Sequence, residues 1–166
     1  MSTLWITFLL LTGAALQTLF PAWAFVGSME WPVLTGLIIY IALRAGRGQV
    51  IYAALLAGLL YDAFSPAPLG MALPFFLLLG IGLHALGEDV FADQIVTYSL
   101  LGLFAVLLKT VYFAVVLSAS GLRPMPLGTL SIRLGGSLLL GVLTAPLVYL
   151  AVSLLHHTGS KNRRHI

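Results

Sequence analysis

Long apolar segments, separated by short breaks, fill almost the whole chain of 166 residues. A membrane-spanning helix needs about 20 mostly apolar residues, with a range of roughly 17 to 25. By this criterion we expect helices at residues 3–22, 31–44, 49–65, 69–87, 95–118 and 134–155. The sequence therefore predicts an all-α integral membrane protein, folded as a compact bundle of about six transmembrane helices.

The composition supports this fold class. Hydrophobic residues make up 60% of the chain and charged residues only 8%, whereas a soluble domain carries roughly 25% charged residues. No remaining segment is long enough for a separate soluble domain, so we expect a polytopic membrane domain at 1–155 and a basic cytoplasmic tail at 156–166. The absence of cysteine excludes disulfides, thiolate metal ligands and a cysteine nucleophile.

Two of the six segments need a separate explanation. Residues 3–20, followed by Ala22-Trp23-Ala24, are similar to a secretory signal peptide, but the usual basic residue before the apolar region is missing. We therefore expect a retained first helix. The apolar part of the second segment, from Trp31 to Leu43, is short for a span. Three arrangements accommodate such a short segment: it has little tilt, it thins the bilayer locally, or it lies partly buried among other helices.

Lysine and arginine in the short loops predict the orientation. With a cytoplasmic N-terminus, most basic loop residues lie inside, as the positive-inside rule requires. The inner set is Arg44, Arg47, Lys161, Arg163 and Arg164, and the outer set is Arg123 and Arg133. We expect both termini in the cytoplasm. We attribute the net charge of +3 to these basic residues that set the topology. We therefore expect no nucleic-acid partner.

Two charged residues, Asp62 and Lys109, fall inside predicted spans at similar depths. A charge at a helix centre costs about 2.5–3.5 kcal/mol on insertion scales, so such residues usually face the protein interior and find a partner. Both share a helix face with small residues, which lets helices approach closely. We expect an intramembrane ion pair between Asp62 and Lys109, with the alternative that Asp62 reaches the outer interface and Lys109 extends toward it.

The turn after Asp62 contains residues that end one helix and start another. Pro66 and Pro68 cannot continue a helix, and Gly70 permits a sharp return. The Asp62 carboxylate is placed to accept hydrogen bonds from loop N–H groups such as those of Leu69 and Gly70, at the start of the fourth helix, where the helix dipole favours an anion. We therefore expect a tight helical hairpin with a buried anion at its apex.

The hairpin resembles the pattern of the MreD family of rod shape-determining proteins: a glycine, two or three apolar residues, an aspartate, a short turn, then proline or threonine, leucine and glycine. The matching residues here are Gly58, Asp62, Ser65, Pro68, Leu69 and Gly70. Length, number of spans and scarcity of loops agree along the whole chain, but only the hairpin is specific at residue level. Lys109 matches no motif of this family.

The resemblance implies a non-catalytic scaffold subunit of the bacterial cell-elongation complex, located in the inner membrane. Its implied partners are MreC, a peptidoglycan glycosyltransferase and a class B penicillin-binding transpeptidase. The family is also similar in architecture to the substrate-binding S components of energy-coupling-factor vitamin transporters, and this is the alternative function. Against it, the alanines of the first helix lack the Ala-x-x-x-Ala pattern with which S components dock their transducer.

Catalysis and metal binding find little support in the sequence. An intramembrane aspartyl protease needs a second carboxylate at the depth of Asp62, and Asp89 and Asp93 fall at the opposite membrane face. His84 has no companion at helical spacing, so we expect it to be a packed residue bonded to a neighbour rather than a metal ligand. We expect no catalytic residues, no cofactor and no metal.

One further stripe of small residues, Ser137, Gly141 and Ala145, follows helical spacing in the last segment. Such stripes allow close helix packing. Packing within this chain is one interpretation. The other is that the stripe faces lipid and receives the single transmembrane helix of a partner such as MreC.

Overall fold

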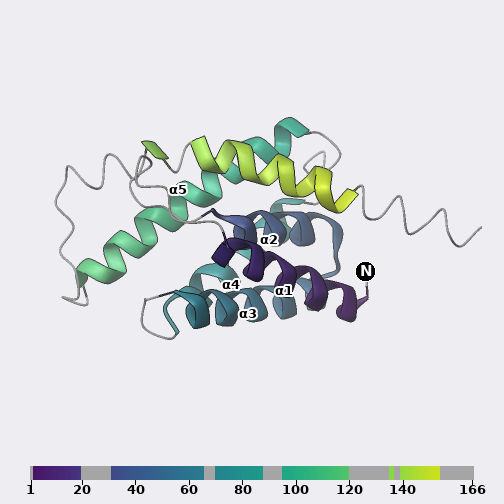
Figure 1. The fold of residues 1–166 in the computed structure, drawn as a ribbon, viewed down its shortest axis with the longest axis horizontal. Coiled ribbons are helices and arrows are strands. Elements are labelled where there is room, and N and C mark those ends of the chain that lie inside the picture. The colour runs from purple at the N-terminus through teal and green to yellow at the C-terminus, as the bar shows by residue number, and fades with distance from the viewer. Residues whose placement is uncertain are drawn as a thin grey trace, which may run out of the picture.

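The structure, a computed structural model, describes residues 2–19, 31–65, 70–87, 95–119, 135–136 and 139–153. These residues form a compact all-α bundle of six helices (Figure 1). The helices are α1 (Thr3–Leu19), α2 (Val33–Arg44), α3 (Arg47–Phe64), α4 (Ala72–Gly87), α5 (Ile95–Ala119) and the C-terminal helix (Leu139–Ser153). The helical bundle and the approximate range of every helix predicted from the sequence are therefore confirmed. The basic tail at 156–166 lies outside the described residues.

Among the described helices one, α5, is long and apolar enough to cross a membrane by length and composition. Four of the other described helices are apolar but have 10–17 residues: α1, α2, α4 and the C-terminal helix. The sixth, α3, has 18 residues but carries Arg47 and Asp62. The predicted membrane assignment of all six helices stays a prediction.

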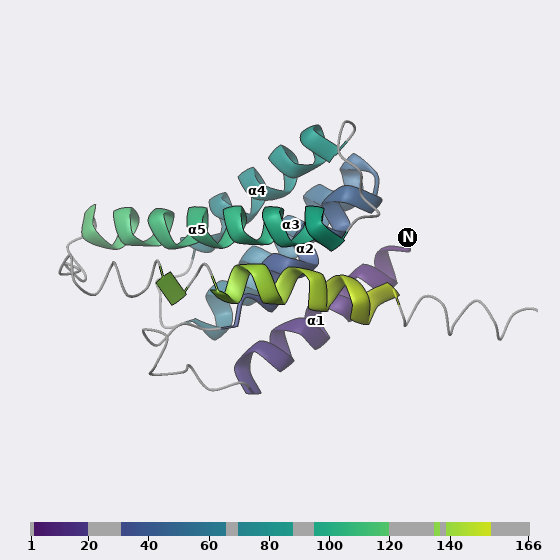
Figure 2. The ribbon, with the colours of Figure 1, turned by 90° about the horizontal axis from the view of Figure 1, so that it is seen from above.

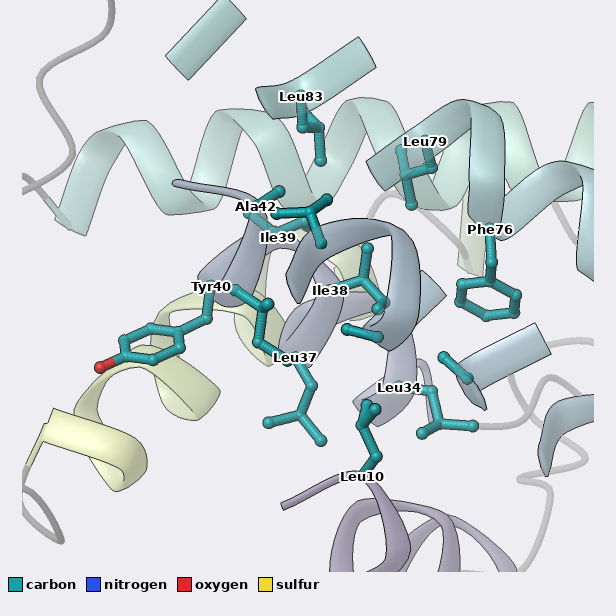
Figure 3. Close-up of a cluster of buried hydrophobic side chains, with 14 of the residues drawn as sticks. Leu10, Leu34, Leu37, Ile38, Ile39, Tyr40, Ala42, Phe76, Leu79 and Leu83 are labelled. Carbon is teal, nitrogen blue, oxygen red and sulfur yellow. The ribbon is translucent and has the colours of Figure 1, made fainter. Parts of the chain in front are cut away.

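The short helix α2 forms the centre of the bundle. Every residue from Leu34 to Ala42 is buried, and α2 packs on α1, α3, α4 and α5. Gly36 faces the sixth helix, because a Cβ atom placed there would lie 3.1 Å from Val148. In Figure 3, Leu10 of α1 and Phe76 of α4 lie on different sides of α2. A helix that is apolar all round and enclosed by others fits one of the three alternatives given for the second segment, burial among other helices.

Side chains from neighbouring helices bind both ends of α2. Pro32, its N-cap residue, makes no side-chain capping hydrogen bond, but the Gln17 side chain of α1 accepts a hydrogen bond from the Leu34 N–H (3.3 Å). Near the other end, Nδ1–H of His84 on α4 donates to the Ala42 carbonyl (3.1 Å). The first N–H and last C=O groups of a helix lack partners within it. The expectation that His84 is bonded to a neighbour is therefore confirmed.

The α5 and C-terminal helices cross at two glycines. They lie side by side in Figures 1 and 2. A Cβ atom at Gly102 would stand only 2.4 Å from the Gly141 carbonyl oxygen, and one at Gly141 would stand 2.7 Å from the Gly102 oxygen. Neither position has room for a side chain at this backbone separation.

We predict that Gly102→Ala lowers the free energy of unfolding by about 1–3 kcal/mol, because an overpacked contact forces the two backbones apart. Gly82→Ala in α4 is the matched control, since an added Cβ meets nothing within 4 Å there. That variant should be neutral or slightly stabilising, because alanine favours a helix. Denaturant unfolding of the protein purified in detergent measures both values. Equal effects of the two substitutions would contradict the close crossing.

Candidate functional site

The carboxylate of Asp62 joins the end of α3 to the start of α4. Asp62 is 3% exposed and lies in the last turn of α3. Its Oδ2 atom accepts a hydrogen bond from the Gly70 N–H (2.9 Å), and its Oδ1 atom accepts one from the Ala72 N–H (3.0 Å). Ala72 is the first residue of α4. The carboxylate therefore caps α4 from another helix, where the helix dipole also favours a negative charge.

Two glycines of the hairpin have distinct geometric roles. A Cβ atom at Gly58 would lie 2.7 Å from the Leu73 Cα atom, so only glycine allows α3 and α4 to approach this closely. Gly70 has a φ of +94°, a conformation that side chains other than hydrogen disfavour. Together the two glycines bring the Gly70 N–H within reach of the Asp62 carboxylate.

The sequence predictions for the hairpin have a mixed outcome. The predicted hydrogen bond from the Gly70 N–H to Asp62 and the sharp return at Gly70 are confirmed. Ser65 is the C-cap residue of α3, and its N–H donates to the Tyr61 carbonyl (2.9 Å). Pro68 and Leu69 lie outside the described residues.

Lys109 of α5 lies in an aromatic environment beside this hairpin. Its side chain is 9% exposed, and its ammonium group is 4.0 Å from the centroid of the Tyr61 ring. The surrounding aromatic cluster comes from three helices and consists of Tyr61, Phe75, Phe76, Tyr112 and Phe113. A cation over an aromatic face contributes about 0.5–2 kcal/mol, with the larger value for desolvated pairs.

The same aromatic cluster connects α5 to the hairpin. Tyr112 donates a hydrogen bond to the Met71 carbonyl, just before α4 (3.0 Å). The rings of Tyr61 and Phe113 have centroids 5.5 Å apart. Tyr61 of α3 thus contacts both Lys109 and Phe113 of α5. These contacts differ from the predicted one, which was a pair between Asp62 and Lys109.

The predicted ion pair between Asp62 and Lys109 is a separate question. Both residues are buried, as expected. The Asp62 oxygens accept from backbone N–H groups, and the Lys109 ammonium lies on the Tyr61 ring. These contacts contribute to the burial of both residues, and the direct pair stays a prediction.

The structure decides between the two interpretations of the stripe at Ser137, Gly141 and Ala145: packing within this chain is confirmed at Gly141 and Ala145, and a partner helix at these two positions is wrong. Gly141 and Ala145 face Gly102 of α5, where a Cβ atom would lie 2.5 Å from the Ala145 Cβ atom, and Ala145 is 2% exposed. Ser137 lies outside the described residues. At Gly141 and Ala145 the predicted partner-helix position is therefore filled by this chain's own α5, since small residues on both helices allow the contact.

A second cluster, which we call the Arg44–tyrosine cluster, was not predicted from the sequence. It consists of Tyr40, Arg44, Tyr98 and Tyr149, and these residues come from α2, α5 and the C-terminal helix. The Tyr98 and Tyr149 rings stack with centroids 4.4 Å apart. The Arg44 guanidinium lies 5.6 Å from the Tyr40 and Tyr149 ring centroids. The sequence feature that could have indicated this cluster is an arginine and three tyrosines near the predicted inner ends of spans.

Neither cluster has the composition of a metal site. Within the described ranges, no three histidine, aspartate or glutamate side chains lie together in a way that could hold a metal ion. The acidic residues Glu88, Asp89 and Asp93 lie outside those ranges. The hairpin holds the Asp62 carboxylate and the Lys109 ammonium in place. These contacts fix the positions of α3, α4 and α5 relative to one another.

Comparisons of the chain with models of protein families, with curated proteins and with solved structures found no match. Any assignment of function therefore rests on the residues and on the geometry of these two clusters.

We predict that Asp62→Ala lowers the free energy of unfolding by about 1–3 kcal/mol, because it removes the acceptor of the buried Ala72 N–H and of the part-buried Gly70 N–H. Asp62→Asn retains one acceptor oxygen and should lose less. Denaturant unfolding in detergent measures both variants. An Asn variant that is as unstable as the Ala variant would argue that the charge, and not hydrogen bonding, matters most.

We also predict that Tyr61 and Lys109 are energetically coupled. A double-mutant cycle with Tyr61→Leu and Lys109→Met should give a coupling free energy of about 0.5–2 kcal/mol. A parallel cycle with Asp62→Asn and Lys109→Met tests the ion pair with the same readout. Additive effects in that second cycle would reject the ion pair, and additive effects in the first would reject the cation–aromatic contact.

Proposed function

We propose that the chain is a multi-pass protein of the bacterial inner membrane with both termini in the cytoplasm. The observation that carries this proposal is the distribution of apolar side chains. Large apolar residues are exposed on every helix around α2, including Leu4 (84%), Leu78 (71%) and Val96 (65%). Soluble proteins rarely expose contiguous apolar surface of this extent, whereas lipid covers such surface favourably.

The buried polar residues support the same proposal. The interior contains Asp62, Lys109, Gln17 and three threonines. The described helix exteriors, in contrast, carry leucine, valine and phenylalanine side chains. Polar side chains facing the bundle interior and apolar ones facing outward are typical of helices in a bilayer, where charges avoid lipid.

The short helices are compatible with a bilayer. At 1.5 Å per residue, helices of 15–18 residues are about 23–27 Å long, close to a hydrocarbon core of about 30 Å. The 12-residue α2 is about 18 Å long by the same rise. Because other helices enclose α2, its ends need partners from protein, and Gln17 and His84 supply them.

Within that membrane, we assign the chain a scaffold role: a non-catalytic subunit of the cell-elongation complex that binds MreC and helps to organise peptidoglycan synthesis. The assignment extends the MreD resemblance. It is supported by three residues of the matching pattern: Gly58 allows the close approach of α3 and α4, Asp62 accepts the Gly70 N–H, and Gly70 has a positive φ. A motif that shapes a rigid outer hairpin suits a subunit that presents a surface to partners. Since α5 covers Gly141 and Ala145, MreC would have to contact another outward face.

Co-purification from detergent-solubilised membranes tests this function. We predict that tagged MreC retains the chain, and that MreC with its transmembrane segment replaced by an unrelated one retains much less, because the contact lies between helices in the membrane. The amount of the chain in the eluate is the measurement. Equal retention by both baits would place the contact outside the membrane, and no retention by either would reject the MreC assignment.

A purification with the tag on this chain separates the scaffold from the alternative, an S component of a vitamin transporter. In that case a tag on this chain would retain an ATPase and its transducer, and a vitamin would raise the unfolding temperature. A ligand present at 100 times its dissociation constant stabilises by about 2.7 kcal/mol.

A further inference from the structure

A charged residue ends the exposed apolar face of α3 on its N-terminal side. Arg47, Leu55 and Leu59 are separated by multiples of four residues, so they share one face of the helix, and all three are exposed. A charged side chain avoids the hydrocarbon core of a bilayer. Arg47 lies at the end predicted to face the cytoplasm, where its guanidinium group complements the anionic headgroups of the inner leaflet.

Non-helical backbone marks the other end of this face. Gly70 is exposed, has a φ of +94° and precedes α4. Irregular backbone in contact with lipid does not occur within the hydrocarbon core. Because the Gly70 N–H donates to the Asp62 carboxylate (2.9 Å), the hydrocarbon beside α3 must end near the level of Asp62. From Arg47 to Asp62, α3 rises about 23 Å at 1.5 Å per residue.

The neighbouring helix α1 has an exposed apolar face of the same length. It packs on α3, and its large exposed apolar side chains run from Leu4 to Leu19, a rise of about 23 Å. We call the exposed sides of α1 and α3 the α1–α3 face. The glycines Gly13 and Gly58 of these helices face other helices of this chain. The α1–α3 face instead carries leucine and phenylalanine side chains. It therefore suits acyl chains better than a partner helix, which approaches most closely at small residues.

The exposed apolar face of α5 is longer. Its large exposed side chains run from Ile95 to Val115, a rise of about 30 Å. The hydrogen bond from Tyr112 to the Met71 carbonyl, just before α4, aligns α5 with the hairpin (3.0 Å). Beyond Tyr112, α5 continues to Ala119, a further rise of about 11 Å. At this end α5 extends past α1 and α3 (Figures 1 and 2).

We propose that the chain holds the bilayer thin along the α1–α3 face and at ordinary thickness along α5. The two faces lie on different sides of α2 in Figure 1. The helix lengths fit a hydrocarbon core of about 23 Å on one side and about 30 Å, the usual value, on the other. Thinning a bilayer costs free energy that rises with the mismatch, so phospholipids with short acyl chains gather at the α1–α3 face. The inference rests on the proposed membrane location and does not depend on MreC.

Quenching of a fluorescent label by brominated phospholipid tests the proposal. The chain has no cysteine, so Leu59→Cys and Phe104→Cys each provide one site for a bimane label. These side chains lie near the middle of the α1–α3 face and of the α5 face. They are 55% and 62% exposed, so a label there leaves the core packing intact. Each labelled full chain is reconstituted into vesicles of myristoleoyl and erucoyl phosphatidylcholine, with the short-chain lipid brominated in one series and the long-chain lipid in the other.

We expect the label at position 59 to report an enrichment of the short-chain lipid of about two- to fivefold over the bulk ratio, as a mismatch of several ångströms implies. The label at position 104 is the matched control and should report the bulk ratio or less short-chain lipid. A second pair, Leu55→Cys and Leu100→Cys, should reproduce the difference, because these side chains are exposed on the same two faces.

The bulk ratio at both faces, or equal enrichment at both, would overturn the proposal and leave the membrane location intact, since both labels would still contact lipid. Absence of quenching at both positions in both series would contradict the membrane location itself, and this inference with it.

Discussion

The architecture depends on supplying hydrogen-bond partners to helix ends that are surrounded by apolar groups. Unpaired N–H and C=O groups at such ends are costly where water is scarce. Here the partners come from neighbouring helices: Gln17 of α1 binds the start of α2, His84 of α4 binds near its end, and Asp62 of α3 binds the start of α4. Each of these contacts satisfies a backbone group and also fixes one helix against another.

This requirement explains why a carboxylate, Asp62, is found at the end of the apolar helix α3. Its two oxygen atoms accept hydrogen bonds from the Gly70 N–H, just before α4, and from the Ala72 N–H, at the first residue of α4. The neighbouring Tyr61 turns its ring to the Lys109 ammonium of α5. Two consecutive residues at the end of α3 therefore connect that helix to α4 and to α5, one through hydrogen bonds and the other through an aromatic face.

Much of the helical layout and part of the hairpin could be predicted from the sequence. Apolar segment lengths and the prolines after Ser65 predict helix ranges, and the spacing of Asp62 and Gly70 predicted a hydrogen bond that the structure contains. Spacing along one helix identifies a face but not what covers it. For that reason the Gly141 and Ala145 face was compatible with a partner helix, whereas α5 occupies it. The Arg44–tyrosine cluster joins residues more than 100 positions apart, and a local pattern carries no information about such contacts.

The two ends of the bundle have different characters. The Asp62 end combines a capped helix start with an aromatic cluster around one ammonium group. The other end gathers three tyrosines and Arg44 from helices α2, α5 and the C-terminal helix. The two ends of the bundle therefore present different chemistry to any molecule that contacts them.

The enclosed position of α2 has a consequence for biosynthesis. When α2 leaves the ribosome, α1 is the one helix of its final environment already made, and α3, α4, α5 and the C-terminal helix follow later. A segment of 12 residues is too short to settle stably across a bilayer by itself. In the proposed membrane location, α2 therefore reaches its enclosed position only after the later helices that pack on it have been made.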